Sequence, residues 1–136
     1  MDLGIKGKVA LITGGSRGLG RQSAIALAAE GVNVAICARG QDQLDITAKE
    51  LNNAGVKVGA YVADLSDESG AIELAAKVEA DLGPIDILVN NVGGSLGTSD
   101  LVNSSLDDFH MVMNANLWSA VALMKHVVPN MQTRGW

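Results

Sequence analysis

The sequence predicts an α/β fold with a doubly wound parallel sheet. Short apolar runs alternate with longer segments of helical spacing, and strands that are apolar throughout are typical of parallel sheets covered on both faces. Glycine and polar residues follow these runs, at the sheet edge where such folds bind their ligands. With 136 residues and 48% apolar content, the chain suffices for one core and is too short for two ordinary domains.

The expected strands are the four apolar runs, and nothing between them resembles a linker or a low-complexity tract. We expect strands over residues 8–13, 32–38, 57–63 and 85–90. Right-handed crossovers between parallel strands then predict an open, incomplete sheet of about four strands in the order 3-2-1-4.

Segments of helical spacing separate the strands, over residues 19–30, 43–53 and 67–82. Ser66 is a suitable cap for the third helix, whose first turn is acidic, and Gly83-Pro84 follows its end. A last helix, over about residues 105–131, begins at the capping sequence Ser105-x-x-Asp108 and is apolar around most of its circumference. We expect one face to pack on this chain and the other to need a partner.

Charge and composition exclude several classes of function. A net charge of −5 and a pI of about 4.8 argue against nucleic acid as a partner. The only cysteine, Cys37, lies in an apolar run and is expected to be a buried thiol, which fits a reducing compartment. The N-terminus lacks the features of a secretory signal, and polar residues such as Asn114 and Lys125 interrupt the apolar stretch 109–128. We therefore expect a cytoplasmic protein whose last helix is buried in protein, with no membrane contact and no metal site.

The stretch TGGSRGLG follows the first strand. Its glycines, Gly14, Gly18 and Gly20, let the backbone turn tightly and approach a ligand, while the next helix points its N-terminal N–H groups at the same place. This geometry suits a pyrophosphate. The glycine spacing also fits a nucleoside-triphosphate loop, but Arg21-Gln22 stands where that motif needs Lys followed by Ser or Thr.

Arg39 stands at the end of the second strand, where NAD sites often carry an acidic residue that binds the adenosine ribose. A carboxylate would repel a 2′-phosphate, whereas a guanidinium binds it bidentately, and Arg17 adds a second positive charge. These residues favour NADP(H) over NAD(H). The alternative is a solvated arginine at a strand end.

Polar residues also follow the third and fourth strands. Asp64 is suited to accept a hydrogen bond from an adenine amino group, or alternatively to form a turn. The sequence Asn90-Asn91-Val92-Gly93-Gly94 brings side-chain amides and open backbone beside the glycine loop, which suits ribose contacts and the holding of adjacent strands. A plain loop is the alternative.

Together, TGGSRGLG, Arg39, Ala63-Asp64-Leu65 and NNVGG resemble a classical short-chain dehydrogenase/reductase of the NADP-preferring kind, over essentially the whole chain. The resemblance implies a Rossmann-type sheet and a cofactor site in which Arg39 binds the 2′-phosphate, and Asp64 and Leu65 the adenine. The implied pyrophosphate loop comprises Gly14, Ser16, Arg17, Gly18, Leu19 and Gly20, and the implied ribose-side loop comprises Asn90, Asn91 and Gly93. Val92 departs from the alanine usual in this motif.

Members of this family also carry an asparagine that interrupts the helix after this loop and holds a water in a proton relay. Asn116 matches best, with Asn114 as the weaker candidate and a helix-satisfied amide as the alternative. The family's chemistry also needs a serine and a tyrosine acid with a lysine four residues later, and these residues have no counterpart here. The only tyrosine is Tyr61, which lies inside the third strand and has Leu65 four positions later.

We therefore expect residues 1–136 to be the N-terminal dinucleotide-binding part of one domain, with Met131 to Trp136 leading into a fifth strand and the catalytic part absent. By resemblance, the parent enzyme would be a ketone or aldehyde reductase, an alcohol dehydrogenase or a 3-oxoacyl-reductase-like enzyme that uses NADP(H) on a small carbonyl or alcohol. The chain alone is expected to be inactive, and the helix over about 105–131 to form a homo-oligomer. A non-catalytic nucleotide-binding module and a structural or assembly fragment remain the alternatives.

Overall fold

A computed structural model describes residues 2–95 and 100–136. The elements in order are β1 Val9–Thr13, α1 Gly18–Ala29, β2 Asn33–Ala38, α2 Gln41–Asn52, β3 Val58–Val62, α3 Glu68–Leu82, β4 Ile87–Val89, α4 Leu106–Met113, the π-helix η1 Asn114–Trp118, and α5 Ser119–Arg134. The sheet is parallel with the order β3-β2-β1-β4, as predicted.

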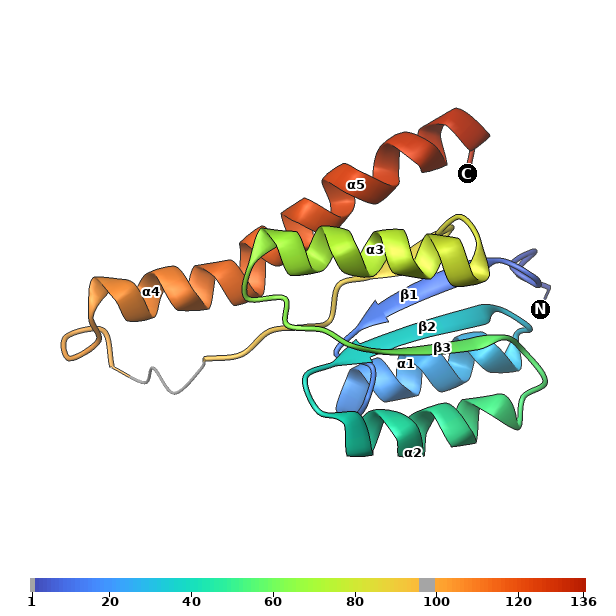
Figure 1. Ribbon diagram of the computed structural model, residues 1–136, viewed down its shortest axis with the longest axis horizontal. Coiled ribbons are helices and arrows are strands. Elements are labelled where there is room, and N and C mark those ends of the chain that lie inside the picture. Colours follow the sequence, from blue (N-terminus) through green and yellow to red (C-terminus); the bar gives the residue numbers. More distant parts are fainter. Residues whose placement is uncertain (1, 96–99) are drawn as a thin grey trace.

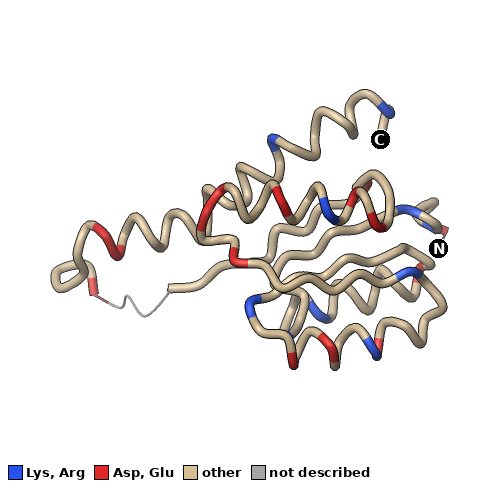
Figure 2. Tube along the Cα trace, viewed as in Figure 1, with Lys and Arg blue, Asp and Glu red and all other residues tan. Residues whose placement is uncertain are grey.

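Helices cover both faces of the sheet (Figure 1), with α1 and α2 on one face and α3 and α5 on the other. Alternate residues of β1 enter the two cores: Leu11 packs with Val78 and Leu123, whereas Ile12 packs with Ile36 and residues of α1 and α2. The strands contain no charged residue, and the charges lie on helices and loops (Figure 2). This arrangement explains why the strand sequences are apolar throughout.

The strand and helix ends differ from the prediction by a few residues. Because β4 pairs with β1 only over Ile87–Val89, this strand is shorter than the predicted residues 85–90. Helix α2 begins two residues before the predicted start, at Gln41. The cap of α3 is Asp67 rather than Ser66, because the Asp67 carboxylate accepts the Ser69 amide hydrogen and is the stronger acceptor.

The last helical region is divided in three. The predicted capping box at Ser105 and Asp108 is present, η1 interrupts the helix at Asn114, and α5 extends to Arg134. As predicted, one face of this helical region packs on the chain, chiefly through Leu123 and Val127 of α5, which are inaccessible, while large apolar side chains such as Leu106 and Trp118 stay exposed. Helix α4 extends beyond the sheet and contributes no buried residue (Figure 1). None of the described helices has the length and apolar character needed to cross a bilayer.

Candidate functional site

The glycine-rich loop connects β1 to α1 at the carboxyl edge of the sheet. Gly14 has φ +64°, a left-handed conformation that L side chains rarely adopt. A Cβ on Gly20 would lie 2.4 Å from the carbonyl oxygen of Gly14, so only glycine lets α1 begin this close to the loop. Arg17 precedes the helix in an extended conformation, and no side chain of the described residues caps it. The N–H groups of the first turn therefore remain available to an anion.

A cavity of about 700 Å³ opens beside this loop. It gathers residues from all four strand ends, which confirms that these segments converge. The predicted site residues that line it are Gly14, Ser16, Arg17, Arg39, Asp64, Leu65, Asn91 and Gly93. The predicted residues outside the lining are Gly18, Leu19, Gly20, Asn90 and Asn116. Sequence reasoning missed Met111 and Ala115, which reach the cavity from the last helical region, because no strand-end pattern marks them.

Two cations and one anion are the charged groups of this lining, namely Arg17, Arg39 and Asp64. Asp64 Oδ1 accepts the Ser66 amide hydrogen at 2.9 Å, so the turn-forming alternative for Asp64 is realised. Hydrogen bonds from the backbone and side chain of Ser66, with a smaller contribution from Arg39, hold the pKa of Asp64 below its usual range. The charge balance of the lining remains positive by one, which favours an anionic ligand.

The loop after β4 is fixed to the end of β1. The side-chain Nδ2 of Asn91 donates to the carbonyl oxygens of Thr13 and Gly14 at 3.1 and 3.2 Å. The Thr13 hydroxyl accepts the amide hydrogens of Asn91 and Val92 at 2.9 and 3.1 Å. Asn91 therefore holds adjacent strands together, as the sequence indicated, and its amide nitrogen is engaged in that bonding.

Asn116 lies in the π-helical interruption and bonds to the same loop. Its Oδ1 accepts the Gly94 amide hydrogen at 2.9 Å, and its Nδ2 donates to the carbonyl oxygens of Gly94 and Val112, each at 2.8 Å. A Cβ on Gly93 would lie 2.7 Å from Asn116 Oδ1. The side chain of Asn116 thus fixes one wall of the cavity, beside the lining residues Gly93 and Ala115.

These features, a glycine turn opening a helix, an arginine after β2 and an Asn-Asn loop after β4, meet in one cavity at the strand ends. The sequence profile described as short chain dehydrogenase matches residues 8–136. The chain belongs to the short-chain dehydrogenase family.

Known family members agree in sequence and structure. The chain is 35% identical over 131 residues to 2-dehydro-3-deoxy-D-gluconate 5-dehydrogenase of Formosa agariphila, covering 96% of this chain and 49% of that protein. L-sorbose reductase from Gluconobacter frateurii, solved with NADPH and L-sorbose, superposes with a TM-score of 0.93 at 34% identity, covering 99% of this chain and 51% of that one. An NAD⁺-bound xylitol dehydrogenase superposes with a TM-score of 0.88 at 30% identity, covering 97% and 51%. The chain spans about half the length of these relatives.

Tyr61 does not line the cavity beside the glycine-rich loop. Its hydroxyl donates to Asp81 Oδ2 at 3.0 Å, and burial together with Asp81 raises its pKa. Cys37 does line the cavity, but burial raises the pKa of its thiol to about 11. Both groups therefore stay protonated at neutral pH, and neither is suited to act as a base or a nucleophile.

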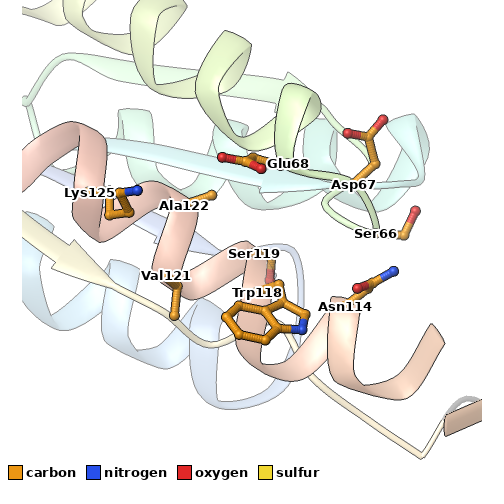
Figure 3. A pocket seen from close by; sticks show the side chains of 9 residues that line it. All are labelled: Ser66, Asp67, Glu68, Asn114, Trp118, Ser119, Val121, Ala122 and Lys125. Carbon is orange, nitrogen blue, oxygen red and sulfur yellow. The ribbon is translucent and has the colours of Figure 1, made fainter. Parts of the chain in front are cut away.

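A second cavity, of about 480 Å³, lies between the start of α3 and the region of η1 and α5 (Figure 3). Asn114, Trp118 and Lys125 line it on one side, and Asp67 and Glu68 on the other. Among the described residues, Ser66 is the only one that lines both this cavity and the first one, beside the glycine-rich loop. Asn114 therefore belongs to the second cavity, whereas Asn116 bonds to Gly94, next to the first cavity's lining residue Gly93.

Proposed function

We propose that this chain is the cofactor-binding, N-terminal part of an NADP(H)-dependent short-chain oxidoreductase. The observation that carries the proposal is the pair Arg17 and Arg39, two guanidinium groups that line one cavity at the carboxyl edge of the sheet. The parent enzyme would reduce a ketone or aldehyde, or oxidise the corresponding alcohol. Its substrate class would then be small carbonyl compounds, as the names of the related sugar reductases and dehydrogenases indicate for those proteins.

The residues of the cavity fit a phosphorylated dinucleotide. The open N-terminus of α1 and the glycine turn would hold the pyrophosphate, and Asp64 and Leu65 would lie along the adenine. Arg39 occupies the position after β2 where a carboxylate would select NAD, and its fork matches a phosphate bidentately. Related structures hold either NADPH or NAD⁺, so the preference for NADP(H) rests on Arg17 and Arg39 in this chain.

When bound, the nicotinamide would exchange a hydride with the carbonyl or alcohol carbon, and the protein would orient the two. In this chain, Asn91 and Asn116 fix the loop that forms one wall of the cavity. The family resemblance assigns Asn116 a further part in the proton relay. We propose that the 136 residues by themselves do not turn over a carbonyl. Their only tyrosine is Tyr61, which lies in β3 and donates a hydrogen bond to Asp81 of α3.

The exposed apolar face of α4 and α5 supports self-association. Its large, accessible side chains are Leu106, Phe109, Met113, Leu117, Trp118, Met124 and Val128. Large apolar side chains exposed along one helical region, here α4, η1 and α5, are typical of interfaces. We propose a homo-oligomer through this face, tested by sedimentation of Trp118→Glu against the unaltered chain. The buried, lone Cys37 thiol supports a reducing, cytoplasmic location.

Calorimetric titration with NADPH and NADH tests the cofactor assignment. We expect NADPH to bind at least about tenfold more tightly, and Arg39→Asp to weaken NADPH binding by about 10- to 100-fold, because charged hydrogen bonds contribute about 1.5–3 kcal/mol. Binding of NADH should change much less. Lys57→Asp is the matched control, since Lys57 is an exposed cation outside the cavity.

Equal affinities for the two cofactors, or an unchanged preference in Arg39→Asp, would overturn the NADP(H) assignment. Binding of NADPH without turnover by a protein whose reading frame stops at Trp136 would support a non-catalytic binding module instead. If the unaltered chain is folded but binds neither NADPH nor NADH, the result would support the structural-fragment alternative.

A further inference from the structure

Thr47 makes a hydrogen bond that is unusual for a residue in a helix. It lies within α2, has no exposed surface, and its Oγ1 donates to the carbonyl oxygen of Ser16 at 2.8 Å. Threonine hydroxyls inside helices commonly bond back to the carbonyl four residues earlier. This hydroxyl instead reaches 31 residues along the chain, to the glycine-rich loop.

The bond joins the two segments that carry the arginines of the cofactor cavity. Ser16 directly precedes Arg17, and it is itself only 7% exposed. Helix α2 follows Arg39 with Gly40 as its cap, so Thr47 belongs to the rigid element that begins beside Arg39. A single buried hydrogen bond therefore links the backbone next to Arg17 to the helix next to Arg39.

A second contact lies one helical turn further along and joins α1 to α2. The guanidinium of Arg21, in α1, donates to both carboxylate oxygens of Glu50, in α2. This pair is partly exposed, so it contributes less than a buried bond. The Arg21–Glu50 pair restrains α1 and α2 relative to each other. Among the described residues of α2, only Thr47 donates a hydrogen bond to the loop carbonyl of Ser16.

We propose that Thr47 is a positioning residue for cofactor selectivity. Its hydroxyl fixes the Ser16–Arg17 backbone against α2 and thereby sets the spacing between Arg17 and Arg39, which a 2′-phosphate must bridge. The proposal rests on the proposed NADP(H) function. The pyrophosphate contacts of this loop are common to both cofactors, but only the 2′-phosphate bridges the two arginines, so the effect is larger for the phosphorylated cofactor.

Thr47→Val tests the proposal, because valine keeps the shape and removes the donor, leaving the Ser16 carbonyl unpaired. We expect NADPH affinity to fall about five- to tenfold and NADH affinity to change less than twofold, so that the selectivity ratio falls. Thr47→Ser keeps the hydroxyl and should restore most of the ratio. Ser119→Ala is the matched control, since it removes another buried hydroxyl that bonds only within its own helical region.

Amide hydrogen exchange of the cofactor-free chain gives a second readout. We expect faster exchange over residues 14–18 in Thr47→Val, with β1 and β2 amides unchanged and no comparable change in Ser119→Ala. An unchanged selectivity ratio in Thr47→Val would overturn the proposal, and so would a general loss of affinity for both cofactors.

Different experimental results would refute the proposed function and the proposed role of Thr47. If the unaltered chain binds NADPH and NADH equally, the proposed NADP(H) function fails. If it prefers NADPH and Thr47→Val keeps that preference, only the role of Thr47 fails. In an Arg17→Ala background, Thr47→Val should lower NADPH affinity less than it does alone, because the group that it positions is gone.

Discussion

Asn91 donates two hydrogen bonds to Thr13, one from its backbone and one from its side chain. The backbone amide of Asn91 donates to the Thr13 hydroxyl at 2.9 Å, and the Asn91 side chain donates to the Thr13 carbonyl at 3.1 Å. Thr13 ends β1 and is 1% exposed, whereas Asn91 follows β4. These two bonds fix the loops after β1 and β4 against each other, and these loops form two walls of the cavity beside the glycine-rich loop.

Thr13→Val should destabilise the chain substantially. The substitution removes the acceptor of two amide hydrogens, those of Asn91 and Val92, at a part-buried position. We expect a loss of roughly 2–4 kcal/mol in the free energy of unfolding, measured in urea. Thr13→Ser keeps the hydroxyl and should lose only about 1 kcal/mol for its missing methyl group. Equal losses in the two variants would contradict the role of the hydroxyl.

Gly20→Ala should disturb both stability and the loop. The new Cβ would lie 2.4 Å from the Gly14 carbonyl oxygen and 2.5 Å from Asn91 Nδ2, so α1 or the loop must shift. We expect a loss of about 1–3 kcal/mol by urea unfolding, together with weaker NADPH binding by titration. Gly40→Ala is the comparison, because φ is −105° there and a Cβ meets nothing within 4 Å. That variant should lose less than about 1 kcal/mol, and an equal loss would contradict the steric explanation.

The cap of α3 can be assigned by a pair of alanine substitutions. Asp67→Ala removes the acceptor of the Ser69 amide hydrogen and should cost about 1 kcal/mol. Ser66→Ala leaves that bond intact and should change the unfolding free energy by less than about 0.5 kcal/mol. Urea unfolding of both variants is the measurement. A larger loss of stability in Ser66→Ala than in Asp67→Ala would identify Ser66 as the cap, as the sequence indicated.

Burial of Cys37 predicts a pH dependence of stability. Desolvation raises the pKa of the thiol from 9.0 to about 11, so the folded chain retains its proton where the unfolded chain loses it. The resulting stability is fully present below pH 9 and is lost as the pH rises toward 11, by roughly 2–3 kcal/mol. We expect Cys37→Ala to flatten this decline in unfolding experiments between pH 8.5 and 10.5. An identical decline in both proteins would show that the Cys37 thiol is not its source.

Local patterns predicted the strands and the helices between them, and the errors in these elements are confined to their ends. Apolar runs and helical spacing were enough to predict β1, β2 and the helices between the strands, because their patterns follow from burial on one or both faces. The exact ends depend on competition between neighbouring groups, as at Asp67 and Ser66. The interruption of the last helix by η1, which contains Asn116, was expected only from the family resemblance, because the sequence there is continuously helical in pattern.

The sequence by itself determined that Gly14, Arg39, Asp64 and Asn91 follow the ends of strands, and therefore that they meet at one sheet edge. Parallel strands with crossovers leave no other arrangement for those ends. Only the tertiary structure decided which groups bond across that edge. The pairing of Thr47 with Ser16, and that of Asn116 with Gly94, joins residues 31 and 22 positions apart. Such contacts depend on how helices pack on the sheet, which has no local signature in the sequence.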